Sequence, residues 1–187
     1  MRFAVLTDIH ANREAYEAVL ADAAMPEIDR IAILGDIVGY GPDPEWCCDK
    51  TKDLVAEGAV CLRGNHDSAA SGVAESMNGM AQRAMDWTKN RLNAEQRRFL
   101  GQLPMTTELD DILLVHASAN DPGAWSYVTS DLRATGSFRA SRSRIILCGH
   151  VHVPMLVSCD RGGTVREQQG QPCASCRHGR GSKSPGL

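Results

Sequence analysis

Seven side chains able to bind a metal ion follow five short apolar runs of this sequence. They are Asp8 and His10 after "AVL", Asp36 after "AIL", Asn65 after "VCLR", His116 after "LLV", and His150 with His152 after "IIL". Carboxylate, imidazole and amide donors suit Mn, Fe, Zn, Ni or Co better than they suit a thiolate zinc site or an all-oxygen calcium site. The sequence therefore predicts a metal centre with mixed nitrogen and oxygen ligands.

The number of donors predicts two metal ions. Seven donors exceed the needs of one tetrahedral ion, and Asp36, alone at its strand end, is the candidate for a shared carboxylate. In an extended chain, residues i and i+2 point the same way, so we expect Asp8 beside His10 and His150 beside His152. Two ions about 3.5–4 Å apart suit in-line displacement at phosphorus and lower the pKa of a bridging water.

The elements that must position these donors form a recognisable pattern. The apolar runs "RFAVL", "IAIL", "AVCL", "ILLV" and "RIILC" are strand-like, and helical segments separate the first three, as in βαβ units. We expect helices over residues 13–24 after Asn12, from Pro44 to about Gly58, over 75–91, and from Asn93 onward. Because the carboxyl ends of parallel strands meet at one edge of a sheet, the donors should converge there.

Length and composition limit the class of protein. A chain of 187 residues with 43% hydrophobic residues can bury one substantial core. The seven cysteines are an odd number and several lie in apolar runs, which favours reduced thiols. No run approaches the roughly 18 apolar residues of a membrane span, and the sequence shows no leader pattern. We therefore expect a cytoplasmic protein with no membrane partner.

The chain divides into a body and a tail of different composition. Residues 161–187 carry five Lys or Arg, one Glu and six Gly, so the body is more acidic than the net charge of −3 indicates. An acidic body argues against a nucleic-acid partner. We predict one domain over residues 1–160 and a basic, Gly/Pro/Ser-rich tail over 161–187 that is disordered.

The strand-end motifs together resemble the calcineurin-like metallophosphoesterase family, in particular its small bacterial branch. The motifs D-x-H, G-D, G-N-H-D, H and G-H-x-H occur in the family's order as Asp8/His10, Gly35-Asp36, Gly64 to Asp67, His116 and Gly149 to His152. "GDIVGYGPDPE" and "ANREAYEAVLADA" add to the likeness, which covers roughly residues 1–157. The resemblance implies an α/β fold with four layers, an α/β/β/α sandwich.

The same resemblance implies a role for each residue. Asp8, His10 and His152 would hold a first metal ion, Asn65, His116 and His150 a second, and Asp36 would bridge them. His66 would lie beside the leaving group, to protonate it or stabilise its charge, and Asp67 would orient and tune the His66 imidazole. The implied cofactors are two divalent ions, manganese first, with iron, zinc, nickel or cobalt as alternatives. The implied reaction is hydrolysis of a phosphomonoester or phosphodiester by a metal-bridging hydroxide.

The C-terminal part departs from the family pattern. Members continue past G-H-x-H with strands that complete the second sheet, whereas this chain offers "MLVS" and "TVRE" before the basic tail. We expect a truncated or altered C-terminal part, an incomplete second sheet, and an exposed sheet edge through which a homo-oligomer could form.

Several alternatives stay open. The substrate would be a small phosphate ester, with nucleotides among the candidates. The chain could instead be a non-catalytic scaffold of the same fold, like a subunit of the retromer complex, or an inactive truncated member. Tyr40, Trp125 and Tyr127 could line the substrate pocket, although ordinary packing is the favoured interpretation. We expect residues 117–143 to form a loop over the site, with a short helix as an alternative for the Ser/Arg-rich part.

Overall fold

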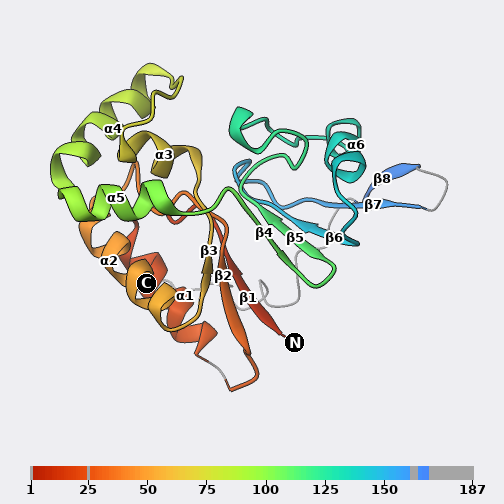
Figure 1. The fold of residues 1–187 in the computed structure, drawn as a ribbon, viewed down its shortest axis with the longest axis horizontal. Coiled ribbons are helices and arrows are strands. Elements are labelled where there is room, and N and C mark those ends of the chain that lie inside the picture. Colours follow the sequence, from red (N-terminus) through yellow and green to blue (C-terminus); the bar gives the residue numbers. More distant parts are fainter. Residues whose placement is uncertain (1, 25, 161–163, 169–187) are drawn as a thin grey trace, which may run out of the picture.

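The computed structural model describes residues 2–24, 26–160 and 164–168 (Figure 1). The first half contains β1 (Phe3–Leu6), α1 (Arg13–Ala23), β2 (Arg30–Ile33), α2 (Pro44–Ala56), β3 (Val60–Cys61), α3 (Asn65–Ser71), α4 (Gly79–Arg91) and α5 (Ala94–Gln102). The second half contains β4 (Thr106–Leu109), β5 (Ile112–Val115), the 3-10 turn η1 (Pro122–Ala124), α6 (Asp131–Ala140), β6 (Ile145–Leu147), β7 (Leu156–Cys159) and β8 (Val165–Gln168). No helix in these described ranges is long and apolar enough to cross a membrane.

Two three-stranded sheets form the centre of the molecule. In the first sheet, ordered β1-β2-β3, neighbouring strands are parallel, with Val5 opposite Ala32 and Ile33 opposite Cys61. In the second, ordered β4-β5-β6, β4 and β5 are antiparallel and β5 and β6 are parallel. The βαβ pattern predicted from the first three apolar runs is confirmed.

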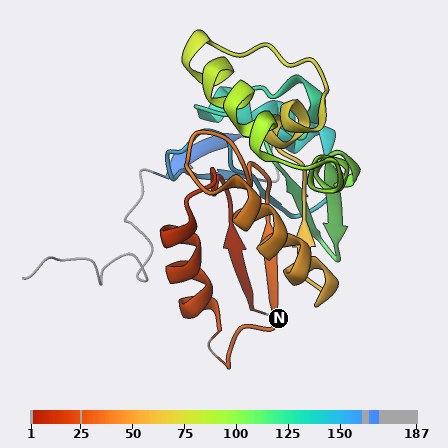
Figure 2. The ribbon, with the colours of Figure 1, turned by 90° about the vertical axis from the view of Figure 1, so that its left-hand side faces the viewer.

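The layers follow from the two faces of the first sheet. Along β2 and the residue after it, Ile33 packs with the helices, whereas Ala32 and Leu34 pack toward Leu114 of the second sheet. This alternation is expected of a strand that is buried on both sides. Helices α1 and α2 lie alongside β1 and β2 (Figure 2), and α6 lies on the far side of the second sheet (Figure 1). The molecule therefore has the predicted α/β/β/α order of the metallophosphoesterase fold.

The helix starts confirm most of the predicted helices. The Asn12 side chain accepts a hydrogen bond from the backbone N–H of Ala15, and Asn93 and Gln96 form a reciprocal capping box. Helix α4 begins after Asn78, a few residues later than predicted. The Ser/Arg-rich segment forms helix α6, so the short-helix alternative holds for that part of residues 117–143.

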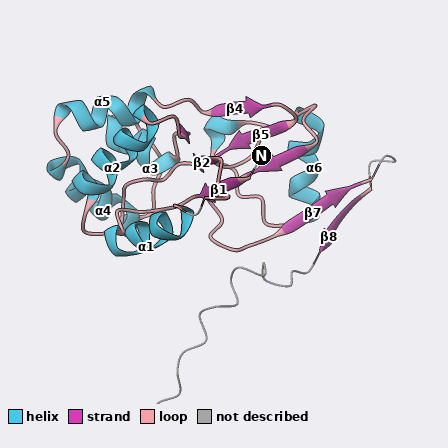
Figure 3. Cartoon of the chain, turned by 90° about the horizontal axis from the view of Figure 1, so that it is seen from below, coloured by secondary structure: helices cyan, strands magenta, loops and turns pink. Residues whose placement is uncertain are grey.

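The C-terminal strands correct one part of the sequence analysis. Strand β8 pairs antiparallel with β7, and it lies within the range predicted to be a disordered tail. The hairpin projects beyond the second sheet (Figure 3). Residues 161–163 and 169–187 lie outside the described residues, so the prediction for the rest of the tail stays a prediction.

Candidate metal centre

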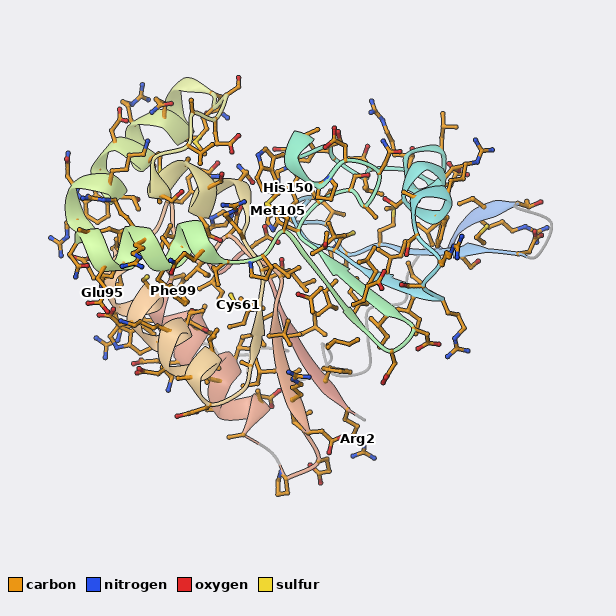
Figure 4. All side chains as sticks on the ribbon, viewed as in Figure 1. Arg2, Cys61, Glu95, Phe99, Met105 and His150 are labelled. Atoms are coloured by element: carbon orange, nitrogen blue, oxygen red, sulfur yellow. The ribbon has the colours of Figure 1, made fainter. Side chains whose placement is uncertain are left out.

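The predicted ligands converge beyond the ends toward which β1 and β2 run, where Figure 4 shows the labelled His150. Their donor atoms form three overlapping groups in which all atoms lie within 4.8 Å of one another. The groups are Asp8, His10 and His152; His10, Asp36 and His66; and Asp36, His116 and His150. Side chains from opposite ends of the domain, such as Asp8 and His152, therefore meet at one place.

The first group combines one carboxylate with two imidazoles. The Nε2 atoms of His10 and His152 are 3.0 Å apart, and His152 Nε2 lies 3.2 Å from Asp8 Oδ1. His10 Nδ1 donates to the backbone carbonyl of Val38 at 3.3 Å, which leaves the lone pair of Nε2 directed at the group. His152 is half exposed, so this end of the site opens to solvent.

Asp36 lies between the first group and the third. Its Oδ1 accepts a hydrogen bond from the backbone N–H of His66, while its Oδ2 is 3.7 Å from His10 Nε2 and 3.4 Å from His116 Nε2. One carboxylate oxygen is thus fixed by the protein and the other faces both groups. This is the position that a bridging carboxylate requires.

The third group is held by backbone carbonyls behind it. His116 Nδ1 donates to the carbonyl of Leu34 at 2.8 Å, and His150 Nε2 donates to the carbonyl of Trp125 at 2.9 Å. Each bond fixes the ring tautomer, so Nε2 of His116 and Nδ1 of His150 are the nitrogens left for a ligand. The sequence did not predict the hydrogen bond between His150 and the Trp125 carbonyl. It indicated only that Trp125 lies in a loop expected over the site.

The expected pairing of Asp8 with His10 is confirmed, because both lie in the first group, whereas the expected pairing of His150 with His152 is wrong. Asp8, His10, His150 and His152 all have positive φ, between 49° and 70°, so the chain turns at each of them instead of running extended. Consequently His150 joins Asp36 and His116, whereas His152 joins Asp8 and His10. Positive φ values cost free energy in residues other than glycine and are most frequent at functional sites. The surrounding structure must therefore stabilise the backbone at these four residues.

Two glycines allow the loops to approach each other closely. A Cβ atom on Gly64 would lie 2.1 Å from Asp36 Oδ1, and a Cβ atom on Gly149 would lie 1.9 Å from Thr7 Oγ1 and 2.6 Å from Asp8 Oδ2. The first residue of the G-N-H-D motif and that of the G-H-x-H motif must therefore be glycine, because a Cβ atom at either position would overlap its neighbours. The backbone N–H of His150, next to Gly149, donates to Asp8 Oδ2 at 3.0 Å.

Two buried polar atoms at the site, Asn65 Oδ1 and His66 Nδ1, have no hydrogen-bond partner, and a third, His116 Nε2, lies 3.4 Å from Asp36 Oδ2 and pairs with it when the ring is protonated. A buried polar atom without a partner is unfavourable, and in native proteins it calls for an ion, a water or a ligand. An amide oxygen, an imidazole nitrogen and the free Asp36 oxygen are all electron-pair donors, so this set fits a divalent cation.

The Asp67 carboxylate binds backbone N–H groups, and its predicted role toward the His66 imidazole stays a prediction. Asp67 Oδ1 accepts from the backbone N–H groups of Ile37 and Val38 at 2.9 and 3.3 Å, and Oδ2 accepts from Gly64 N–H at 3.0 Å. Both oxygens thus hold the two loops that carry Asp36 and Asn65, and neither makes a hydrogen bond to the His66 imidazole. The sequence could not separate these roles, because Asp67 directly follows His66 in the chain.

The charges of the site favour an ionised Asp36 beside a protonated His116 when no cation competes. Burial alone would raise the pKa of Asp36, but the hydrogen bond and charge of His116 lower it. Burial alone would lower the pKa of His116, but Asp36 raises it to about 9. Burial lowers the pKa of His66 to about 4, so that imidazole is neutral near neutral pH. A cation that binds both Asp36 and the Nε2 atom of His116 would therefore displace a proton from His116.

The chain belongs to the calcineurin-like phosphoesterase superfamily, whose domain model matches residues 1–181. A metallophosphoesterase from Sphaerobacter thermophilus is 39% identical, and its structure superimposes with a TM-score of 0.72 over 83% of this chain and 62% of that one. The uncharacterized protein MJ0912 of Methanocaldococcus jannaschii is 36% identical over 83% of this chain and 64% of its own length. The chain thus spans less than two thirds of both relatives.

A more distant structure supports the fold alone. The hypothetical protein PH1004 from Pyrococcus horikoshii OT3 is 19% identical and has a TM-score of 0.66, with 89% of this chain and 86% of that chain covered. The family predicted from the five strand-end motifs is confirmed, as is the metallophosphoesterase fold.

Proposed function

We propose that the protein is a metal-dependent phosphoesterase that hydrolyses phosphomonoesters or phosphodiesters with two divalent ions. The observation that carries the proposal is the position of Asp36, whose Oδ2 lies 3.7 Å from His10 Nε2 of the first group and 3.4 Å from His116 Nε2 of the third, together with the buried, unpartnered Asn65 Oδ1. The family match and the likeness to a named metallophosphoesterase support the same reaction class.

The proposal assigns each ligand to one of two ions. Asp8, His10 and His152 hold the first ion, Asn65, His116 and His150 hold the second, and Asp36 belongs to both. Manganese is the favoured metal, and iron, zinc, nickel and cobalt suit the same donors. When bound, such ions polarise phosphoryl oxygens and make water acidic enough to act as a nucleophile near neutral pH.

The protein's own contribution is to hold these donors in place and to support the leaving group. The carbonyls of Val38, Leu34 and Trp125 fix the tautomers of the three imidazoles that they contact. His66 lines the cleft beside the ligands, and burial lowers its pKa to about 4, so the neutral ring can donate one hydrogen bond. In this position it stabilises the charge that develops on the leaving oxygen of the ester.

The site has room for a phosphate group. A cleft of about 210 Å³ is lined by His10, Asp36, Asn65, His66, His150 and His152 together with Tyr40, Tyr127 and Val151. Its lining is mostly polar side chains, as an anionic ester held by cations would need.

The test is turnover of a panel of monoesters and diesters, beginning with p-nitrophenyl phosphate and bis(p-nitrophenyl) phosphate, by protein loaded with Mn²⁺. Wild-type protein is expected to hydrolyse at least one class, and Asp36→Asn is expected to lose the activity. A folded, metal-loaded protein that hydrolyses no ester of the panel would overturn the proposal. If Mn²⁺ also left the melting temperature unchanged, the scaffold alternative would be favoured.

A further inference from the structure

Two tyrosines share the cleft with the candidate ligands although the reaction proposed above needs neither. Tyr40 follows β2, and Tyr127 lies in the loop before α6. The exposed fractions of their side chains are 48% and 58%. Residues packed for stability are usually hidden, and the neighbouring Val38 and Val128 are indeed buried. The rings therefore face the cleft and the solvent.

Each ring is nevertheless held in a defined place. The Tyr40 ring lies 4.8 Å from the His10 ring and 4.6 Å from the His66 ring, and the Tyr127 ring stacks on His150 at 4.2 Å with an angle of 24°. Tyr40 has φ of 63°, a conformation that costs on the order of 1 kcal/mol for a residue with a Cβ atom. A glycine or an asparagine would make the same turn with less strain, so the turn alone does not account for a tyrosine.

The loops behind the rings explain how this placement is maintained. A Cβ atom on Gly39 would lie 2.3 Å from His66 Nδ1, so the chain before Tyr40 runs directly against the imidazole. On the other side, Trp125 binds His150 through its carbonyl, and its indole N–H donates to Glu75 Oε2 at 2.9 Å. This bond ties the loop of Tyr127 to the segment before α4.

Hydrogen bonding by the hydroxyl groups does not explain why these two residues are tyrosines either. Among the described residues, neither the Tyr40 nor the Tyr127 hydroxyl makes a hydrogen bond to another protein group. What both residues offer at the cleft is aromatic surface, next to imidazoles at either end of the ligand cluster. Aromatic surface of this kind binds planar rings, and stacking of a nucleobase on an aromatic side chain contributes about 1–3 kcal/mol.

We propose that Tyr40 and Tyr127 form an aromatic mouth that selects nucleoside phosphates, in which a planar base lies one ribose away from the phosphorus. The inference rests on the proposed function, because it assigns the group that is esterified to the phosphate at the same site. The tyrosines are specificity-determining residues, and hydrolysis itself is carried out by the ligand groups and water.

The test compares two esters that have the same leaving group. AMP and ribose 5-phosphate both release a primary alcohol of ribose, so they differ only in the base, and their methyl esters form the matching diester pair. With Mn²⁺-loaded full-length protein, kcat/KM is expected to be at least about fivefold higher for the adenosine compound of the hydrolysed pair. Equal values, or a preference for the ribose compound, would overturn the inference while leaving the proposed function in place.

Substitutions of the two tyrosines test whether they cause the preference for the adenosine compound. Tyr40→Leu and Tyr127→Leu are expected to bring the ratio of the two kcat/KM values toward one, whereas Tyr40→Phe and Tyr127→Phe keep it, since they keep the ring. The ratio is the informative readout because a disturbed His10 or His150 lowers both rates alike. Trp87→Leu is the control, because Trp87 is also a partly exposed aromatic residue but lies on α4 outside the cleft lining. A ratio unchanged in both leucine variants would contradict the assignment.

A failure of catalysis would still leave the inference testable. If neither these compounds nor any ester of the panel is hydrolysed, the proposed function is contradicted, and calorimetric titration of AMP and ribose 5-phosphate into the Mn²⁺-loaded protein measures binding at the aromatic mouth directly. AMP is then expected to bind at least about fivefold more tightly, by the same stacking contribution. Equal affinities would overturn the inference.

Discussion

Replacement of Gly149 by alanine should damage the site through one added methyl group. Gly149 has no positive φ, so alanine meets no backbone strain there, but its Cβ would lie 1.9 Å from Thr7 Oγ1 and 2.6 Å from Asp8 Oδ2. Contacts of a Cβ atom under 3.0 Å are essentially never observed, so the groups must separate by about 1 Å. The Asp8 carboxylate, which lies 3.2 Å from His152 Nε2, is one of the groups displaced.

A displacement of about 1 Å at a catalytic centre can lower the rate by about 100-fold, and overpacking of this kind costs about 1–3 kcal/mol of unfolding free energy. We therefore expect Gly149→Ala to lower kcat/KM for an aryl phosphate ester by about two orders of magnitude and to reduce the metal content of the purified protein. The assay is ester hydrolysis with Mn²⁺, accompanied by elemental analysis and urea unfolding.

A matched control separates steric overlap from the general effect of a glycine-to-alanine change. Gly123, in the 3-10 turn η1, also has no positive φ, and a Cβ atom there meets nothing within 4 Å, so Gly123→Ala is expected to behave as wild type. If Gly149→Ala kept both its full metal content and a kcat/KM within a factor of five of wild type, the tight approach of the G-H-x-H loop to Asp8 would be refuted.

Three further predictions follow from contacts around the site. Asp67→Asn places an NH₂ group against the N–H of Gly64, so the free energy of unfolding of metal-free protein, measured in urea, should fall by about 2–3 kcal/mol. A fall of less than about 0.5 kcal/mol would contradict the hydrogen bonds from buried backbone N–H groups to Asp67. The pKa of His116 is raised from 6.5 to about 9 by Asp36, so its stabilising contribution to metal-free protein is complete below pH 6.5 and is lost as the pH rises through about 9. Over the same window Mn²⁺ should release about one proton on binding, which calorimetry in buffers of different ionisation enthalpy measures; no release at pH 7.5 would contradict it. Among the described strands, β6 at the edge of the second sheet pairs only with β5, and its Ile145 is 38% exposed, so sedimentation should detect a dimer that Ile145→Lys weakens. A monomer at high concentration would refute association through this edge.

The sequence was sufficient for the parts of the site that depend on strand position. Polar residues after buried parallel strands must meet at one edge of the sheet, so Asp8, Asp36 and Asn65 could be placed together without coordinates. The capping residues Asn12 and Asn93 likewise predicted helix starts, because their side chains satisfy backbone N–H groups that the helix leaves free.

The sequence was insufficient where the chain leaves regular geometry. The i and i+2 rule assumes an extended backbone, and positive φ at His150 and His152 separates their side chains into different groups. Helix α3 was not anticipated because its first residues are the G-N-H-D motif, whose chemistry hid its helical pattern.

The central claim is that Asp36 joins two metal ions, and electron paramagnetic resonance of the Mn²⁺-loaded protein tests it most directly. Two ions that share one carboxylate oxygen are close enough for their spins to couple. The account predicts an exchange-coupled spectrum that appears at two Mn²⁺ per chain and is absent in Asp36→Asn. A simple six-line signal from isolated Mn²⁺, unchanged as the second equivalent is added, would contradict it.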